Sequence, residues 1–337
     1  MQRTHAASVP ANGGVSHLLR TDELPRAFLL QTNVDFRWLD LNTSTREVVI
    51  RPYDGHFVPP KQATDAWLAA NRERLRTALV LDTETTGLDW RRDSIIEIGL
   101  RAIQYVRSTG EIVRVIDAYD ALQDPGVPLP AKVQQLTGLT DRDLAGQSID
   151  VARVSALIAS AQLIIAHNAA FDRPFIDAFL ASRGPRHEAT KSPAWACSIV
   201  QIDWESHGLP GTKLEMLCAL HGFYSTAHRA GADADALVRL LSLRNRESGT
   251  TYLQQLLEFA RAPWILVSAD GSPIETKDLL KERRYTWSVT RRVWQRIIRG
   301  DQRTDEEAWL AATIYGGRSF ASFREIRPTE RFAATDP

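Results

Sequence analysis

Two carboxylates follow a short apolar run near residue 80, and their spacing could support chemistry on a cation. The apolar residues 79–81 lead into Asp82 and Glu84, and two threonines and Gly87 close the segment. Side chains two positions apart on a strand share a face, so Asp82 and Glu84 should point the same way. Like charges this close repel, which is unfavourable unless a cation lies between them. The alternative is an edge strand with two solvated acids.

Two further acids stand near predicted helix starts. The apolar strand 163–166 runs into Asp172, which opens a helix with apolar positions 175, 176 and 179. Asp233 precedes another apolar-periodic segment, and His228 lies five residues earlier on the incoming loop. Taken singly, each acid caps a helix and suits its dipole, and a loop histidine is more often structural or solvated. Taken together, these residues indicate one shared site.

The overall composition is that of an ordinary globular protein of one or two cores. The chain has 337 residues, 44% of them hydrophobic, and a formal net charge of +0, so any nucleic-acid surface must be a local patch. Cys197 and Cys218 have neither zinc spacing nor the density of a disulfide scaffold, which predicts buried thiols in a reducing compartment. No signal-peptide pattern or membrane-length apolar stretch occurs, so we expect a cytoplasmic protein with no membrane partner.

The segments between the acids predict the elements that position them. Residues 94–100 and 112–116 read as strands with short connections, which favours an antiparallel meander with the strand at 79–85. Helices are expected at 131–135, from Thr140 onward and at 151–159. A helix over 66–75 should lead directly into the first strand.

The acidic segments resemble, in order and spacing, the three motifs of the DEDDh exonucleases. This 3′→5′ exonuclease family includes the proofreading epsilon subunit of bacterial replicative DNA polymerase and ribonuclease T. The matching residues are Asp82-x-Glu84 with Thr-Thr-Gly, His167-Asn168-Ala169-x-Phe171-Asp172, and His228-x4-Asp233. The resemblance spans roughly residues 77–243, and the stretches 195–198 and 213–223 are most similar to the epsilon-like members.

The resemblance implies a fold and a division of the chain. The fold is α/β, a ribonuclease H-like mixed sheet flanked by helices. We assign residues 1–76 to an N-terminal extension, 77–248 to the exonuclease domain, and 249–337 to a helix plus a small α+β C-terminal module. Within the extension, residues 1 to about 20 suit a flexible tail, and the runs 28–30, 36–39 and 48–50 are expected to form a small β appendage.

The resemblance also implies a two-metal site. Four carboxylates balance the charge of two divalent cations, and oxygen-only ligands suit Mg²⁺ or Mn²⁺ rather than zinc. Asp82 is expected to bridge the cations, with Glu84 and Asp233 on the ion that activates water. Asp172 is expected to act on the second ion. His228 is the expected general base, because histidine titrates near neutral pH.

The same resemblance predicts the substrate contacts. Thr85, Leu136 and Phe171 are expected to pack around the 3′-terminal nucleotide, where an apolar or aromatic wedge accepts every base. The implied activity is hydrolysis of phosphodiester bonds from the 3′ end of single-stranded DNA, releasing 5′-mononucleotides in replication or repair. Two alternatives stay open: an RNA-trimming exoribonuclease, or a proofreading subunit that acts mainly by binding a polymerase or sliding clamp.

The C-terminal region shows a local basic patch. Between residues 277 and 303 there are nine basic and three acidic residues, interleaved with Trp287 and Trp294. This composition suits a nucleic-acid surface, or else two tryptophans that fill a small core beneath solvated arginines. We expect a helix at 277–284, a hairpin of 285–289 with 293–298, and a helix capped by Thr304 and Glu307. Residues after Gly316 are expected to be a loose tail.

A helix over 252–260 precedes this module. Within it, residues 255–259 bear a faint likeness to a sliding-clamp-binding pentapeptide, but their helical spacing favours a place in the core.

Overall fold

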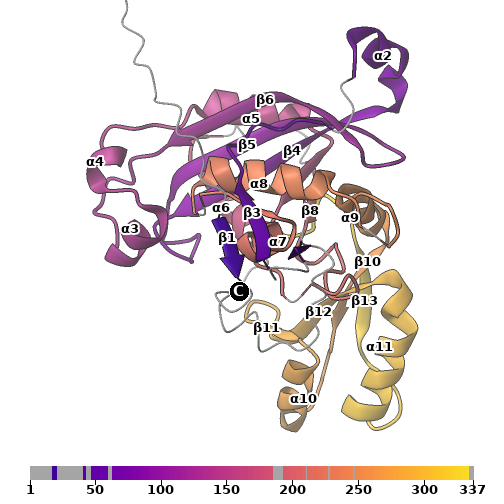
Figure 1. Cartoon of the computed structure of the whole chain (residues 1–337). Helices are drawn as coiled ribbons and strands as arrows, with labels where there is room; N and C mark the ends of the chain where they lie inside the picture. Colours follow the sequence, from indigo (N-terminus) through magenta and orange to yellow (C-terminus); the bar gives the residue numbers. More distant parts are fainter. Residues whose placement is uncertain are drawn as a thin grey trace, which may run out of the picture.

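A mixed five-stranded sheet forms the centre of the molecule (Figure 1). The computed structural model describes residues 17–20, 41–42, 47–59, 63–184, 193–209, 211–226, 228–245 and 247–333. Strands β4 (Leu75–Thr85), β5 (Ile95–Val106) and β6 (Ile112–Leu122) form the predicted antiparallel meander. Strands β7 (Leu163–Ala166) and β8 (Ala194–Cys197) continue the sheet parallel to β4, in the order β6-β5-β4-β7-β8. This is the expected ribonuclease H-like arrangement.

Helices cover both faces of the sheet because alternate residues of the central strand β4 are apolar on both sides. Leu79 and Leu81 pack under α5 (Val151–Ser160) and α6 (Ala169–Ala181). Ala78 and Val80 pack on the other face under α7 (Leu214–Leu220), α8 (Ala230–Ser242) and α9 (Tyr252–Arg261). A strand buried on both sides reads as a continuous apolar run, which explains the sequence pattern.

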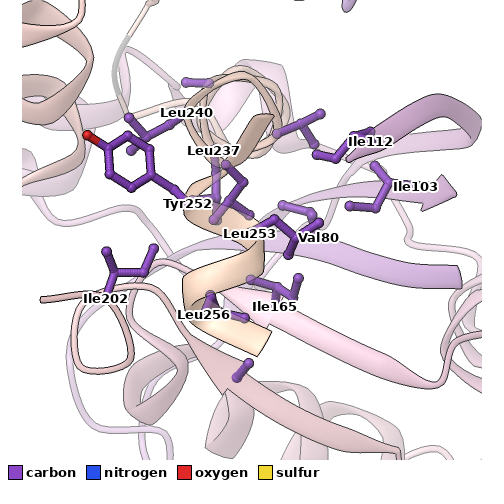
Figure 2. Packing of buried hydrophobic residues seen from close by; sticks show 14 of the residues in the cluster. Val80, Ile103, Ile112, Ile165, Ile202, Leu237, Leu240, Tyr252, Leu253 and Leu256 are labelled. Carbon is purple, nitrogen blue, oxygen red and sulfur yellow. The ribbon is translucent and has the colours of Figure 1, made fainter. Parts of the chain in front are cut away.

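The second of these faces positions the acids. Figure 2 shows Val80, Ile103 and Ile165 of the sheet packed against side chains of α8 and α9, including Leu237 and Leu253. Asp82 and Glu84 continue the row that begins with Ala78 and Val80, because side chains two apart share a face. The apolar cluster therefore ends where the carboxylates begin.

Helix α9 contributes to this cluster, and its packing shows which of residues 255–259 are buried. Leu256 and Leu257 within it are buried at 0% and 4% exposure. The prediction that helical spacing places these residues in the core is confirmed for Leu256 and Leu257, whereas Phe259 is half-buried and Glu258 is exposed. Both cysteines are buried free thiols, as expected.

Several boundaries differ from the sequence expectation. The predicted helix over 66–75 is α2 (Asp65–Ala70) followed by a 3₁₀ turn (Arg72–Arg74), and β4 begins at once after it.

Helices α3 (Ala131–Thr137) and α4 (Asp141–Leu144) lie where they were expected. Gly138 ends α3 with a φ of 70°, and Thr140 with Asp143 forms the predicted capping box of α4.

The N-terminal extension contains a small sheet. Strand β3 (Glu47–Pro52) confirms the predicted run 48–50, and it pairs with β1 (His17–Arg20), β2 (Leu41–Asn42) and β9 (Phe223–Tyr224). The prediction of a tail through residue 20 is therefore wrong for residues 17–20, whose strand partner lies about 30 residues later. The predicted runs 28–30 and 36–39 lie outside the described residues.

The C-terminal module is a four-stranded antiparallel sheet in the order β11-β12-β10-β13. Its strands are β10 (Trp264–Ser268), β11 (Thr286–Ser288), β12 (Val293–Arg299) and β13 (Ser322–Ile326). Helices α10 (Lys277–Glu282) and α11 (Arg303–Trp309) accompany it, and a π-helical turn (Leu310–Ile314) follows α11. The hairpin of β11 and β12 confirms the sequence prediction.

Two expectations for this module are wrong. Helix α11 begins at Arg303, after Gln302, so Thr304 lies inside the helix and does not cap it. The residues after Gly316 are not a loose tail, because β13 pairs with β10 over its whole length. The sequence pattern did not indicate β13, because most of its side chains are exposed and its partner strand lies more than 50 residues earlier.

The segment after β13 joins the module to the main sheet. Arg331 is buried and donates hydrogen bonds to the carbonyls of Ala260 and Ala262 at the end of α9. Arg173 of α6 in turn donates to the carbonyls of Thr329 and Arg331. Buried carbonyls without partners are costly, so these arginines hold the segment in place. No helix in the described ranges has the length and apolar character needed to cross a bilayer.

Replacement of Arg331 by alanine should destabilise the folded chain by about 2 kcal/mol, because two carbonyls lose their donor and the packed side chain is lost. Chemical denaturation followed by circular dichroism measures the change. Arg327→Ala is the matched control, since Arg327 lies in the same segment but is exposed and pairs only with Glu330. Equal stability of the two variants would contradict the docking role of Arg331.

Candidate active site

The five residues singled out in the sequence come from three elements that meet near the carboxyl end of β4. Asp82 and Glu84 are the last acids of β4. Asp172 lies in the first turn of α6, and Asp233 lies in the first turn of α8. His228 lies on the loop that enters α8.

Asp172 joins the site through the backbone of β4. Its Oδ1 accepts from the backbone N of Thr83 at 3.1 Å and from the Thr83 hydroxyl at 2.9 Å. Strand β7 pairs with β4 only from Ala78 to Val80, so the N–H of Thr83 has no strand partner on that side and Asp172 takes its place. Helix α6 begins at Ala169, so the expectation that Asp172 opens and caps the helix is wrong.

Glu84, His228 and Asp233 form the tightest group. One ligand atom from each lies within 4.8 Å of the others. The backbone N of His228 donates to Asp233 Oδ2 at 3.0 Å, and His228 adopts a φ of 61°. This left-handed conformation is uncommon for a residue with a side chain, and the bond to Asp233 helps to hold it. The histidine is thereby fixed beside the two carboxylates.

Burial raises the pKa values of all four carboxylates, and repulsion from the other site acids adds to the shifts of Asp82 and Glu84. For Asp82, burial acts first, followed by the charges of Asp172, Asp233 and Glu84, and its pKa rises well above the ordinary value. Burial and then Asp233 raise the pKa of Glu84 to about 8. Burial raises the pKa of Asp172 to about 7 and that of Asp233 to about 6. Clustered, desolvated carboxyls of this kind are typical of functional sites.

The residues present fit hard divalent cations. Within the described residues, no hydrogen bond or ion pair reaches the carboxylates of Asp82 or Glu84. Uncompensated charges are costly when buried, and a cation removes the cost. The donors are carboxylate oxygens together with one imidazole, which suits Mg²⁺ or Mn²⁺ better than a soft metal.

A fifth acid, Glu97 of β5, lies beside the site and was not singled out in the sequence. It stands directly opposite Glu84 in the β4–β5 ladder and is buried. The guanidinium of Arg229 binds its carboxylate at 2.9 to 3.1 Å, and the backbone N of Ala230 also donates to it. Glu97 thus fastens the residue after His228 to the sheet. The only signal for this role was a glutamate inside an apolar strand, which requires a partner.

A glycine and an arginine bring α8 against the sheet. Gly99 faces Asp82 across the ladder, and a Cβ there would lie 2.3 Å from the carbonyl of Ala230. Only glycine lets the helix start approach this closely. Arg101, on the same face of β5, pairs with Asp120 and with Asp235 of α8, each at 2.6 Å. Neither residue was marked by the sequence motifs.

His167, within the second motif, has a structural place. It is buried, its Nδ1 lies 2.7 Å from the Ser198 hydroxyl and its Nε2 lies 2.5 Å from the Thr212 carbonyl oxygen. Burial lowers its pKa, which favours the neutral ring. His167 therefore ties the loop after β7 to two neighbouring segments.

The predicted substrate contacts differ in their surroundings. Thr85 is buried and its hydroxyl donates to the carbonyl of Gly87 at 2.5 Å. Phe171 is half-buried and packs on Phe175 with ring centroids 5.0 Å apart. Leu136 on α3 is 48% exposed. Thr85 directly follows Glu84 in the chain, and Phe171 directly precedes Asp172. No contact of Leu136 with the carboxylates is found in the described residues.

Comparison with known proteins agrees with this geometry. Residues 79–241 match a family model described as Exonuclease. This domain-sized segment, just under half of the chain, is similar to that family. The domain is 30% identical over 181 residues to a PolC-type DNA polymerase III of Streptococcus pyogenes serotype M5, and 31% identical over 174 residues to that of serotype M1. The matches cover 51% and 49% of this chain but only 11% of each polymerase.

Solved structures of E. coli exonuclease I are also similar. The complex with a dT13 oligonucleotide has a TM-score of 0.45 at 17% identity, covering 66% of this chain and 63% of that chain. The zinc-bound complex with single-stranded DNA has a TM-score of 0.43 at 18% identity, with the same coverage.

The raised pKa values predict that stability without metal falls as pH rises. A carboxyl whose pKa is raised by folding favours the folded state only while it is protonated, so stability is lost between the ordinary value of 4.5 and the folded value of about 8 for Glu84. In EDTA, the thermal midpoint should therefore fall between about pH 5 and about pH 8, and Mg²⁺ or Mn²⁺ should restore it at the higher pH.

Glu84→Gln provides the control for this titration, because it removes one of the raised groups while keeping the shape of the side chain. Its midpoint should depend less on pH in EDTA and respond less to Mg²⁺. A wild-type midpoint that neither falls with pH nor rises with metal would contradict the cation site.

Proposed function

We propose that this chain is a metal-dependent 3′→5′ exonuclease that removes 5′-mononucleotides from the 3′ end of single-stranded DNA. The observation that carries the proposal is the meeting of four carboxylates of raised pKa with His228 at the end of β4. It lies within the segment that matches the exonuclease family.

Asp82, Glu84, Asp172 and Asp233 would hold two divalent cations, Mg²⁺ or Mn²⁺. The charges of Asp172, Asp233 and Glu84 all raise the pKa of Asp82, which supports the proposal that Asp82 would be shared by both cations. When bound, such cations neutralise charge on the phosphate and lower the pKa of the attacking water. The hydrogen bonds from Thr83 aim Asp172 at this position.

His228 is the proposed general base. One of its ring nitrogens lies in the same group as the oxygens of Glu84 and Asp233, and its backbone is fixed by Asp233. A histidine there can accept the proton of the attacking water. The Glu97–Arg229 pair holds the next residue, which supports the backbone position of His228 beside the acids.

DNA is the favoured substrate because the similar PolC-type proteins are DNA polymerases. Thr85, Leu136 and Phe171 would contact the terminal nucleotide, and contacts of this type accept any base. A role in replication or repair beside a polymerase or sliding clamp, in the cytoplasm, is consistent with these relatives. An exoribonuclease is the second candidate, since tolerance of the 2′-hydroxyl depends only on the shape of the pocket.

Digestion of matched DNA and RNA tests the proposal. With 5′-labelled single strands and Mg²⁺, the DNA ladder should shorten from its 3′ end. EDTA should stop the reaction, and Asp82→Asn should slow it at least about 100-fold because a charge that holds the cations is lost. Glu325→Gln, an exposed acid on β13, is the control and should retain full activity.

Each alternative has its own outcome in this assay. Shortening of RNA alone would move the substrate to RNA and keep the chemistry. If neither strand is shortened, the enzyme proposal fails for the isolated chain, and co-purification with a polymerase or clamp would then test the binding-subunit role. Full activity of Asp82→Asn would reject the site itself.

His228→Ala or His228→Asn should lower the rate by about 100- to 10,000-fold, the usual contribution of a general base, while cation and DNA binding are largely kept. Single-turnover hydrolysis measures the rate, and the thermal shift caused by Mg²⁺ reports cation binding. Loss of that thermal shift in the variant would mean that His228 acts as a ligand and not as the base.

A further inference from the structure

The hairpin of β11 and β12 carries an unusual run of positive charge. Residues 283–299 contain six arginines and no aspartate or glutamate. β11 is an edge strand of the module, and Figure 1 shows it on the side away from α11. Its outer edge has no strand partner among the described residues.

Three of these arginines form ion pairs within the module. Arg283 and Arg296 bind the buried carboxylate of Glu306 at 3.1 and 3.0 Å. Arg299 pairs with Asp301. These cations serve the fold, and they show that the basic composition alone does not define a binding surface.

The other three arginines remain exposed. Arg284, Arg291 and Arg292 have no ion pair with any residue that the structure describes, and they lie at the two ends of the β11 hairpin. Arg284 and Arg292 adopt φ values of 65° and 53°, where glycine is more stable than a residue with a side chain. Arg284 adopts this conformation just after α10, where left-handed residues commonly end a helix.

An exposed tryptophan lies between these cations in the sequence. Trp287 is 47% exposed although tryptophan usually loses most of its surface on folding. It is the cross-strand partner of Trp294, and the two rings meet edge to face with centroids 5.5 Å apart. Trp294 packs on the core of the module, so Trp287 is held against a fixed support with part of its ring facing solvent.

We propose that this hairpin surface, formed by Trp287 with Arg284, Arg291 and Arg292, binds single-stranded nucleic acid. A base would stack on Trp287, and the three guanidinium groups would contact the flanking phosphates. The proposal deepens the proposed exonuclease function, since it gives the strand a second contact outside the carboxylate site. An acidic peptide would satisfy the arginines but gives no role to the exposed ring.

Fluorescence anisotropy with labelled thymidine oligonucleotides of about 5 and about 25 nucleotides tests the surface, because the longer one exceeds a single binding site. The full chain is used in EDTA, so that no hydrolysis occurs. Trp287→Ala should weaken binding of the longer strand about tenfold. Arg291→Gln with Arg292→Gln should also reduce the slope of log affinity against log salt by about 1.4.

Matched controls lie at the opposite edge of the module. Phe320 is 65% exposed and Arg318 is exposed, both before β13. Phe320→Ala and Arg318→Gln should bind both oligonucleotides like the wild type. In Mg²⁺, the hairpin variants should hydrolyse the short oligonucleotide at saturation as fast as the wild type, which a misfolded variant would not.

Unchanged affinity of the hairpin variants for the longer strand, or an equal loss in the controls, would overturn the proposal. Binding in EDTA does not depend on catalysis, so absence of exonuclease activity would leave this measurement valid. Conversely, exonuclease activity together with unchanged affinity of the hairpin variants for the longer strand would reject only the second contact.

Discussion

Repulsion among carboxylates at the end of β4 is the constraint on which this structure depends. Four acids meet there with raised pKa values, and Glu97 adds a fifth beside them. The fold opposes this repulsion with attractive contacts placed just outside the cluster. Arg229 neutralises Glu97, and Arg101 binds Asp235 at the start of α8. The proposed cations would neutralise the remaining charge, and residues outside the cluster hold its geometry.

The two faces of one strand explain how distant residues reach this point. Odd and even positions of β4 pack under different helices, and one helix on each face, α6 or α8, delivers a site acid from its first turn. β7 is short, which frees the N–H of Thr83 for Asp172. Gly99 gives α8 the space to begin beside Asp82. The arrangement of the acids thus depends on the short length of β7 and on the absence of a Cβ at Gly99.

The C-terminal module is tied to the exonuclease core by buried polar contacts. Arg173 and Arg331 connect α6, the end of α9 and the segment after β13 through backbone carbonyls. Such bonds are directional, so they fix the place of the module along α9 more tightly than apolar contact alone. The exposed β11 hairpin is therefore carried on a supported sheet and not on a mobile arm, which suits a surface that must be pre-formed for a long ligand.

The sequence by itself determined the local features of this protein. Local sequence patterns predicted the bounds of β7, the shared face of Asp82 and Glu84, and the β11–β12 hairpin. Each of these features depends on neighbours within a few residues. The motif spacing also marked His228 and Asp233, which the structure groups with Glu84. Only the tertiary structure decided the partners of Glu97 and Arg101, the pairing of β13 with β10 and the exposure of Trp287. Those features depend on segments tens of residues or more apart in the chain, and no local pattern specifies which distant segment will pack beside a given strand.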